Sequence, residues 1–121
     1  MVAPIKLIVA GSRKFQDEHV FDQYILAYLT EYEDVTIITG MAKGPDRMAY
    51  DYAMFHDVPV IEFPANWDLH GRSAGYIRNA EMLKSATHLL AFWDGVSKGT
   101  KNMIDIATKA GIHVTVILVT V

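Results

Sequence analysis

Short apolar runs alternate along the chain with longer stretches in which apolar residues recur at helical spacing. The short runs are nearly continuous, which is typical of strands buried on both faces of a sheet. They predict strands at Ile5–Ala10, Val35–Thr39, Val58–Phe63, His88–Trp93 and His113–Val119. The amphipathic stretches predict helices at Asp17–Tyr32, Pro45–Phe55, Ala74–Ser85 and Lys98–Ala110, with Gly111 as the C-cap of the last one. The segment Pro64–Gly75 predicts a polar loop that carries aromatic residues.

Strands and helices that alternate with short links predict a parallel sheet with helices on both faces. We therefore expect an α/β fold, Rossmann-like and in three layers, with a five-stranded parallel sheet in the order 3-2-1-4-5. The length of 121 residues predicts one domain over 1–121, because a chain of this size has room for a single core. In such sheets ligands bind outside the carboxyl ends of the strands, where the strand order reverses.

Three polar loops that contain glycine each follow a predicted strand at its carboxyl end. They span Gly11–Lys14, Thr39–Asp46 and Asp94–Thr100. Glycine lets the backbone approach a ligand closely, and the helix start that follows each loop offers free N–H groups. Such a site suits an anion, most often a phosphate. The expected strand order brings the loops together, so the sequence predicts a site for a nucleotide.

The candidate ligand-binding residues come from these loops and from the segment after the third strand. They are Gly11, Ser12, Arg13, Gly40, Lys43, Gly44, Asp46, Trp67, Arg78, Asn79, Asp94, Gly95, Ser97, Gly99 and Thr100. An arginine such as Arg13 can hold a phosphate with two hydrogen bonds. Trp67 is a candidate to stack on a base, and Asp46 is a candidate to contact ribose hydroxyls.

Each of these assignments has a structural alternative. Arg13 can be a solvated turn residue, and Trp67 can be a lid residue that packs on the core. Asp46 can be an acid favoured by the dipole at a helix start, and Thr100 can be an N-cap. Arg78 falls off the apolar face of its helix, so it points either to the surface or into the cleft.

Composition and charge exclude several classes of protein. The net charge of −3 argues against a broad nucleic-acid-binding face, so we do not expect nucleic acid as a partner. The second loop lacks the Gly-Lys-Ser/Thr of a Walker A motif, and Gly-x-Gly-x-x-Gly is absent too. The chain has no cysteine, which is typical of an intracellular protein, and we expect a cytoplasmic one. The apolar runs are too short to span a membrane. The histidines lack metal-ligand spacing, so we assign neither a metal nor another cofactor.

Five tyrosines lie on the first two predicted helices. They are Tyr24, Tyr28, Tyr32, Tyr50 and Tyr52. They indicate either a homo-oligomeric face or ordinary packing of the helices on the sheet.

Four ordered motifs resemble the SLOG superfamily, which joins the Smf/DprA proteins and the Lonely Guy (LOG) proteins. They are Gly11-Ser12-Arg13, Gly40 with Gly44-Pro45-Asp46, Gly75 with Arg78-Asn79 and Met82, and Asp94-Gly95 with Gly99-Thr100. The order is similar to the YspA branch of small bacterial and phage proteins. The resemblance implies a Rossmann-like fold and a nucleotide or a nucleotide derivative as the ligand.

The enzymatic LOG proteins cleave the N-glycosidic bond of nucleoside monophosphates. Arg78 matches the arginine of their signature, but Asn79 replaces its lysine, and Met103 stands at the position of the catalytic glutamate. Methionine carries no charge and cannot act as a base, so the LOG mechanism is not expected here. Asp46, Asp94 or Glu81 would have to substitute for that glutamate.

The hypotheses therefore come from three classes. The leading one is a protein that binds a nucleotide-derived ligand as a sensor or to sequester it. The second is a nucleotide N-glycosidase of the phosphoribohydrolase type, with Asp46, Arg78 and Asp94 as the candidate catalytic residues. The third is binding of single-stranded DNA by analogy with the DprA proteins, which the acidic balance disfavours.

Overall fold

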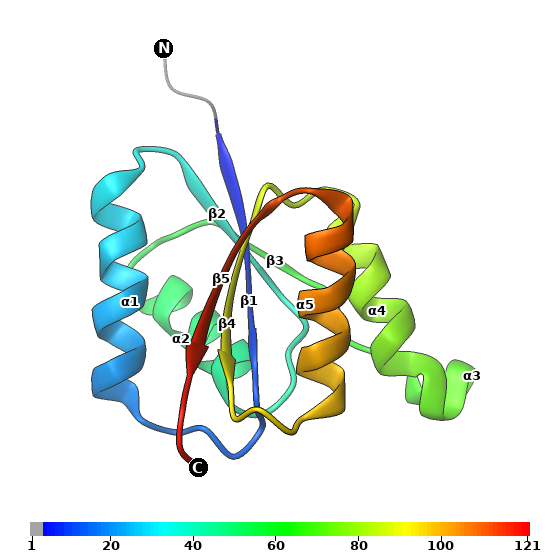
Figure 1. Ribbon diagram of the computed structural model, residues 1–121. Helices are drawn as coiled ribbons and strands as arrows, with labels where there is room; N and C mark the ends of the chain where they lie inside the picture. Colours follow the sequence, from blue (N-terminus) through cyan, green and yellow to red (C-terminus); the bar gives the residue numbers. More distant parts are fainter. Residues whose placement is uncertain (1–3) are drawn as a thin grey trace.

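The computed structural model describes residues 4–121 as one five-stranded sheet with helices on both faces (Figure 1). All the strands are parallel, in the order β3-β2-β1-β4-β5. The strands are β1 (Ile5–Gly11), β2 (Val35–Thr39), β3 (Val60–Glu62), β4 (His88–Trp93) and β5 (His113–Leu118). The predicted Rossmann-like class and the strand order are both confirmed.

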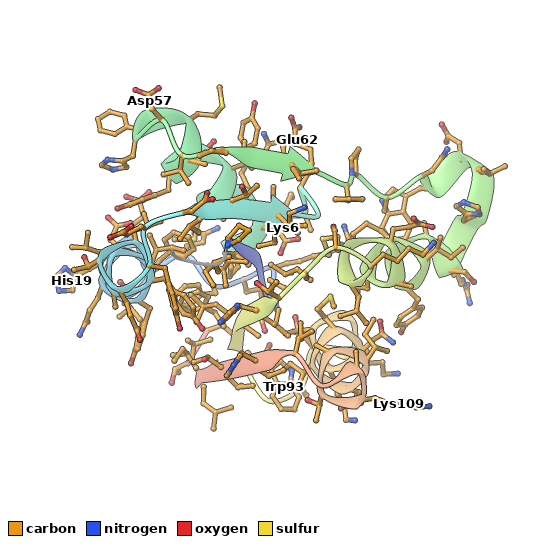
Figure 2. All side chains as sticks on the ribbon, turned by 90° about the horizontal axis from the view of Figure 1, so that it is seen from above. Lys6, His19, Asp57, Glu62, Trp93 and Lys109 are labelled. Carbon is orange, nitrogen blue, oxygen red and sulfur yellow. The ribbon has the colours of Figure 1, made fainter. Side chains whose placement is uncertain are left out.

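The helices divide between the two faces of the sheet (Figure 2). One face is covered by α1 (Glu18–Glu31) and α2 (Pro45–Phe55), and the other by α4 (Ala74–Leu83) and α5 (Lys98–Ala110). None of the helices within residues 4–121 is both long enough and apolar enough to cross a bilayer.

The continuous apolar run of β1 is buried because its side chains alternate between these two faces. Leu7 and Val9 pack into the cluster beneath α1 and α2. Ile8 packs into the opposite cluster, where Met82 of α4 and Met103 of α5 also lie. The central strand is therefore held from both sides, and its carboxyl end is fixed relative to the helices that surround the site.

The structure differs from the expectation mainly between β3 and α4. Two short helical segments interrupt the predicted loop, namely α3 (Trp67–His70) and the 3-10 helix η1 (Gly71–Ser73). The Asn66 side chain accepts a hydrogen bond from the Leu69 N–H and so caps α3. In Figure 1 α3 lies beyond α4, at the end of the molecule to which the arrowheads of β4 and β5 point.

The tyrosines of the first two helices are half-buried rather than exposed. Tyr24, Tyr28, Tyr32 and Tyr52 pack against the cluster beneath α1 and α2. Their contacts agree with ordinary helix packing, and the homo-oligomeric face stays without support.

Candidate functional site

A cleft of about 390 Å³ opens at the carboxyl ends of the central strands, between the loop after β2 and the first turns of α4 and α5. Nine of the predicted site residues line it. They are Gly11, Arg13, Asp46, Trp67, Arg78, Asn79, Ser97, Gly99 and Thr100. The structure thus brings together residues from three loops that are far apart in the sequence, at the place where doubly wound folds bind ligands.

Four basic side chains line the cleft, namely Arg13, Arg72, Arg78 and Lys98. Within residues 4–121 none of these four side chains has a carboxylate oxygen within 4.0 Å. The two ion pairs of that length join Lys84 to Glu81 and Lys101 to Asp105, all on exposed helix surfaces. Burial lowers the pKa of Arg78; Asp46 opposes this shift and the nearby charge of Arg13 adds to it. Mutually repelling cations of this kind are stabilised by an anion between them.

Asp46 is the buried acid of the cleft. Its side chain lies on the first turn of α2 and only 4% of the residue is exposed. Burial raises the pKa of Asp46 to about 6, and the charge of Arg78 together with backbone hydrogen bonds at Ala42 and Gly40 opposes that rise. A carboxyl group with this pKa changes its charge near neutral pH, so it can accept or donate a proton there.

Arg78 and Asn79 face the cleft, not the surface. The Arg78 Nη1 donates to the carbonyl of Gly40 at 2.7 Å, and its Nε donates to the Asn79 Oδ1 at 3.1 Å. The buried Asn79 in turn donates to Asn102 Oδ1 and to the Gly99 carbonyl. A Cβ at Gly40 would lie 2.5 Å from Arg78 Nη1, so only glycine leaves room for the guanidinium here. This chain of contacts ties the loop after β2 to the first turn of α5.

Ser12 and Asp94 hold the neighbouring loops in place. The Ser12 Oγ accepts from the Asp94 N–H at 3.0 Å and lies 3.0 Å from the Ser97 hydroxyl. The Asp94 carboxylate accepts from the N–H groups of Val96 and Ser97 and from the Ser97 hydroxyl. These hydrogen bonds hold the pKa of Asp94 at about 2. Neither side chain lines the cleft, and a carboxylate so strongly hydrogen-bonded is a weak base.

The first turn of α5 borders the cleft. Ser97 is the N-cap, so the alternative in which Thr100 is the N-cap does not apply. The Ser97 side chain makes no capping hydrogen bond, so the N–H groups of the first turn lack that partner. Lys98, Gly99 and Thr100 of this turn all line the cleft. Free N–H groups, the helix dipole and a lysine together favour an anion.

Besides Ser12 and Asp94, four predicted residues lie outside the cleft lining. Lys43 and Gly44 line a neighbouring hollow together with Phe15 and Arg47. Gly44 adopts φ of +84°, and a Cβ there would lie 2.6 Å from the Ser12 carbonyl, so it lets two loops approach each other. Gly40 is in contact with the Arg78 guanidinium, and Gly95 forms the exposed turn after β4.

Several residues that line the cleft were not among the predicted site residues. They include Ala10, Ala42, Arg72, Gly75, Tyr76, Lys98 and Met103. Arg72 and Lys98 could have been found from the positive charge they add next to the predicted loops. Met103, at the position of the LOG glutamate, is buried and puts a thioether on the cleft wall. Glu81 is exposed and pairs with Lys84, away from the cleft. In the described part of the chain no three His, Asp or Glu side chains gather as metal ligands would.

Comparison with known proteins gives three matches. Residues 5–70 match the family described as YspA, cpYpsA-related SLOG. The Gene 61 protein of Mycobacterium phage D29 is 32% identical over 117 residues, which cover 90% of this chain and 93% of the phage protein. DNA processing protein A (DprA) from Streptococcus pneumoniae superposes with a TM-score of 0.74 at 18% identity over 98% of this chain. The chain spans about half of DprA (52%), and this likeness shows the fold alone.

The family match includes two of the motifs that carried the resemblance, Gly11-Ser12-Arg13 and Gly40 with Gly44-Pro45-Asp46. It extends over more than half of the chain, and the phage protein is similar over nearly its whole length. The chain therefore belongs to the SLOG family related to YspA and cpYpsA.

Proposed function

We propose that the cleft binds a nucleotide or a nucleotide-derived ligand, and that the protein acts as a sensor of this ligand or sequesters it. The observation that carries the proposal is the group of Arg13, Arg72, Arg78 and Lys98 around one cleft without a carboxylate partner within 4.0 Å in residues 4–121. Membership of the SLOG family suggests nucleotide-related binding or processing.

The geometry favours one orientation of the ligand. Its phosphate lies against the first turn of α5, whose residues Lys98, Gly99 and Thr100 line the cleft. Asp46, on the first turn of α2, then receives the ribose hydroxyls. Asp94 and Ser12 support this arrangement indirectly, because they hold the loop that leads into α5.

Gly99→Ala tests the phosphate site. A Cβ at Gly99 meets no protein atom within 4 Å, so the substitution leaves the fold intact and adds up to about 1 kcal/mol of helix propensity. The same methyl group occupies space that a phosphate needs against the backbone. We expect AMP to bind at least tenfold more weakly by calorimetry while the midpoint of urea denaturation stays equal or rises. An unchanged affinity for AMP would place the phosphate elsewhere.

A second candidate function is hydrolysis of the N-glycosidic bond. It is favoured by the buried Asp46, whose pKa of about 6 suits a general base at neutral pH. In this reaction water attacks C1′ of the ribose, Asp46 takes a proton from that water, and the C1′–N bond breaks. The products are the free base, which leaves with a proton, and ribose phosphate. Release of free base from a nucleoside monophosphate therefore distinguishes this candidate from simple binding.

DNA is the third candidate ligand, because DprA is described as a DNA processing protein. The net charge of −3 opposes it, and we keep the prediction that nucleic acid is not a partner. Affinity for a single-stranded oligonucleotide that falls steeply with added salt would contradict this prediction. The cytoplasmic location inferred from the lack of cysteine also stays a prediction.

A further inference from the structure

Arg13 and Trp67 face each other at the mouth of the cleft. The Cζ of Arg13 lies 6.0 Å from the centroid of the Trp67 ring, and both side chains line the cleft. Arg13 belongs to the loop after β1, and Trp67 begins α3 on the other side of the opening. Two flat groups from different walls are thus already paired by a cation–π contact.

We propose that these two side chains form a clamp that stacks the planar base of the ligand between the guanidinium and the indole. The inference rests on the proposed function and assigns its base-binding part. It also changes the expected role of Arg13, which holds the base while Lys98 and the first turn of α5 hold the phosphate.

The spacing suits such a clamp. Stacked rings in nucleic acids lie about 3.4 Å apart, so a ring between two planar groups needs about 7 Å. The Arg13 Cζ lies 6.0 Å from the centroid of the Trp67 ring, so the two groups would have to move apart to admit a base. Without a base the guanidinium and the indole contact each other. A base between them replaces this cation–π contact by two stacking contacts, one with each group.

The position of α3 makes this small movement inexpensive. Trp67 is 51% exposed, and every residue of α3 is exposed. The helix packs mainly against η1 and α4 and extends away from the sheet (Figures 1 and 2). Few buried contacts oppose a shift of Trp67 away from Arg13.

One other arginine of the cleft is held elsewhere. Arg78 is fixed by its hydrogen bonds to Gly40 and Asn79. Arg13, which is exposed and without a carboxylate within 4.0 Å in the described residues, is the guanidinium that lies over the Trp67 ring.

Tryptophan fluorescence tests the clamp directly. The chain has two tryptophans, so Trp93→Phe leaves Trp67 as the only indole, and Trp67→Phe reports the background from Trp93. We expect AMP to quench the emission of Trp67 in the Trp93→Phe protein. Ribose 5-phosphate, which carries the phosphate and no base, should bind by calorimetry and leave this emission unchanged.

Two variants of the full chain separate stacking from charge. Trp67→Leu should weaken AMP binding about tenfold or more and leave the affinity for ribose 5-phosphate within about twofold. Arg13→Lys keeps the charge but lacks the flat guanidinium, so it should also weaken AMP selectively. The exposure of both residues makes loss of the fold an implausible cause, which the denaturation midpoints check.

The outcomes separate the clamp from the binding site as a whole. If AMP and ribose 5-phosphate bind equally well, and neither substitution changes this, the clamp is overturned and the anion site remains. If Arg13→Lys preserves AMP binding and Arg13→Gln weakens both ligands alike, Arg13 binds phosphate and the clamp is likewise overturned. If neither ligand binds to the unaltered protein, the proposed function fails and the clamp fails with it.

Discussion

Replacing Gly11 with alanine should lower the free energy of unfolding by about 3 kcal/mol, the upper part of the range for overpacked cores. A Cβ at Gly11 would lie 2.5 Å from the Phe92 carbonyl oxygen and 2.5 Å from the Pro45 Cγ. The Phe92 carbonyl accepts the Ser12 N–H at 2.9 Å, so it cannot move without loss of that hydrogen bond. Three elements, β1, β4 and the start of α2, would have to separate. Urea denaturation of the two proteins measures the difference.

Gly99→Ala is the matched control for this experiment. It adds the same methyl group at a position where no atom lies within 4 Å, and Gly99 has no positive φ. Its denaturation midpoint should therefore stay equal or rise. If Gly11→Ala were as stable as this control, β1, β4 and α2 would not approach each other as closely as described.

The largest functional effect is expected from Asp46→Asn, which should stabilise the protein at pH 7 and impair its site. Burial raises the folded pKa of Asp46 from 3.8 to about 6. The folded state then binds more protons than the unfolded state between these values. The stability that protonated Asp46 contributes is therefore fully present below about pH 3.8 and is lost as the pH rises to about 6. Two pKa units correspond to about 3 kcal/mol.

Asparagine carries no charge, so it avoids this loss. The stabilisation of Asp46→Asn measured at pH 7 should exceed that measured at pH 4 by about 2 kcal/mol. Any change in hydrogen bonding that alters the free energy of unfolding equally at both pH values cancels in this difference. Asp105→Asn, which replaces an exposed carboxylate paired with Lys101, should change stability by less than about 1 kcal/mol at either pH. Equal effects of Asp46→Asn at both pH values would show that the pKa of Asp46 is not raised.

The same variant separates the two candidate functions. If the protein hydrolyses nucleotides, loss of the general base should lower turnover by about 10²- to 10⁴-fold while part of the binding remains. If the protein only binds its ligand, Asp46→Asn should weaken the contact with the ribose hydroxyls and change no reaction. Undiminished turnover in this variant would remove Asp46 from the mechanism.

The sequence predicted the architecture because its signals are local and strong. The run from Ile5 to Ala10 and the run from His88 to Trp93 each fill both faces of a strand, and β4 has the predicted bounds. The bounds of α5 and its C-cap Gly111 also agree, since φ of +81° at Gly111 is a conformation that glycine adopts readily. Parallel connectivity then left few strand orders to consider.

Other features depend on packing that no short pattern contains. Helix α3 has four residues, too few for an apolar period, so the segment resembled a loop. Lys43 belongs to a predicted loop, yet it points to a neighbouring hollow instead of the cleft. The raised pKa of Asp46 results from burial by distant elements. Asp94 and Ser97 were predicted as ligand contacts, but the Asp94 carboxylate is occupied by hydrogen bonds within its own loop.

The most direct test of the central claim is native mass spectrometry of the purified protein after incubation with nucleoside monophosphates, ADP-ribose and cyclic nucleotides, with both retained ligand and released products analysed. We expect the protein to retain one of these compounds, the Gly99→Ala and Trp67→Leu variants to retain less of it, and a denatured sample to retain none. Retention of no compound in the panel by the unaltered protein, with no product released, would contradict the proposal that this cleft is a nucleotide site.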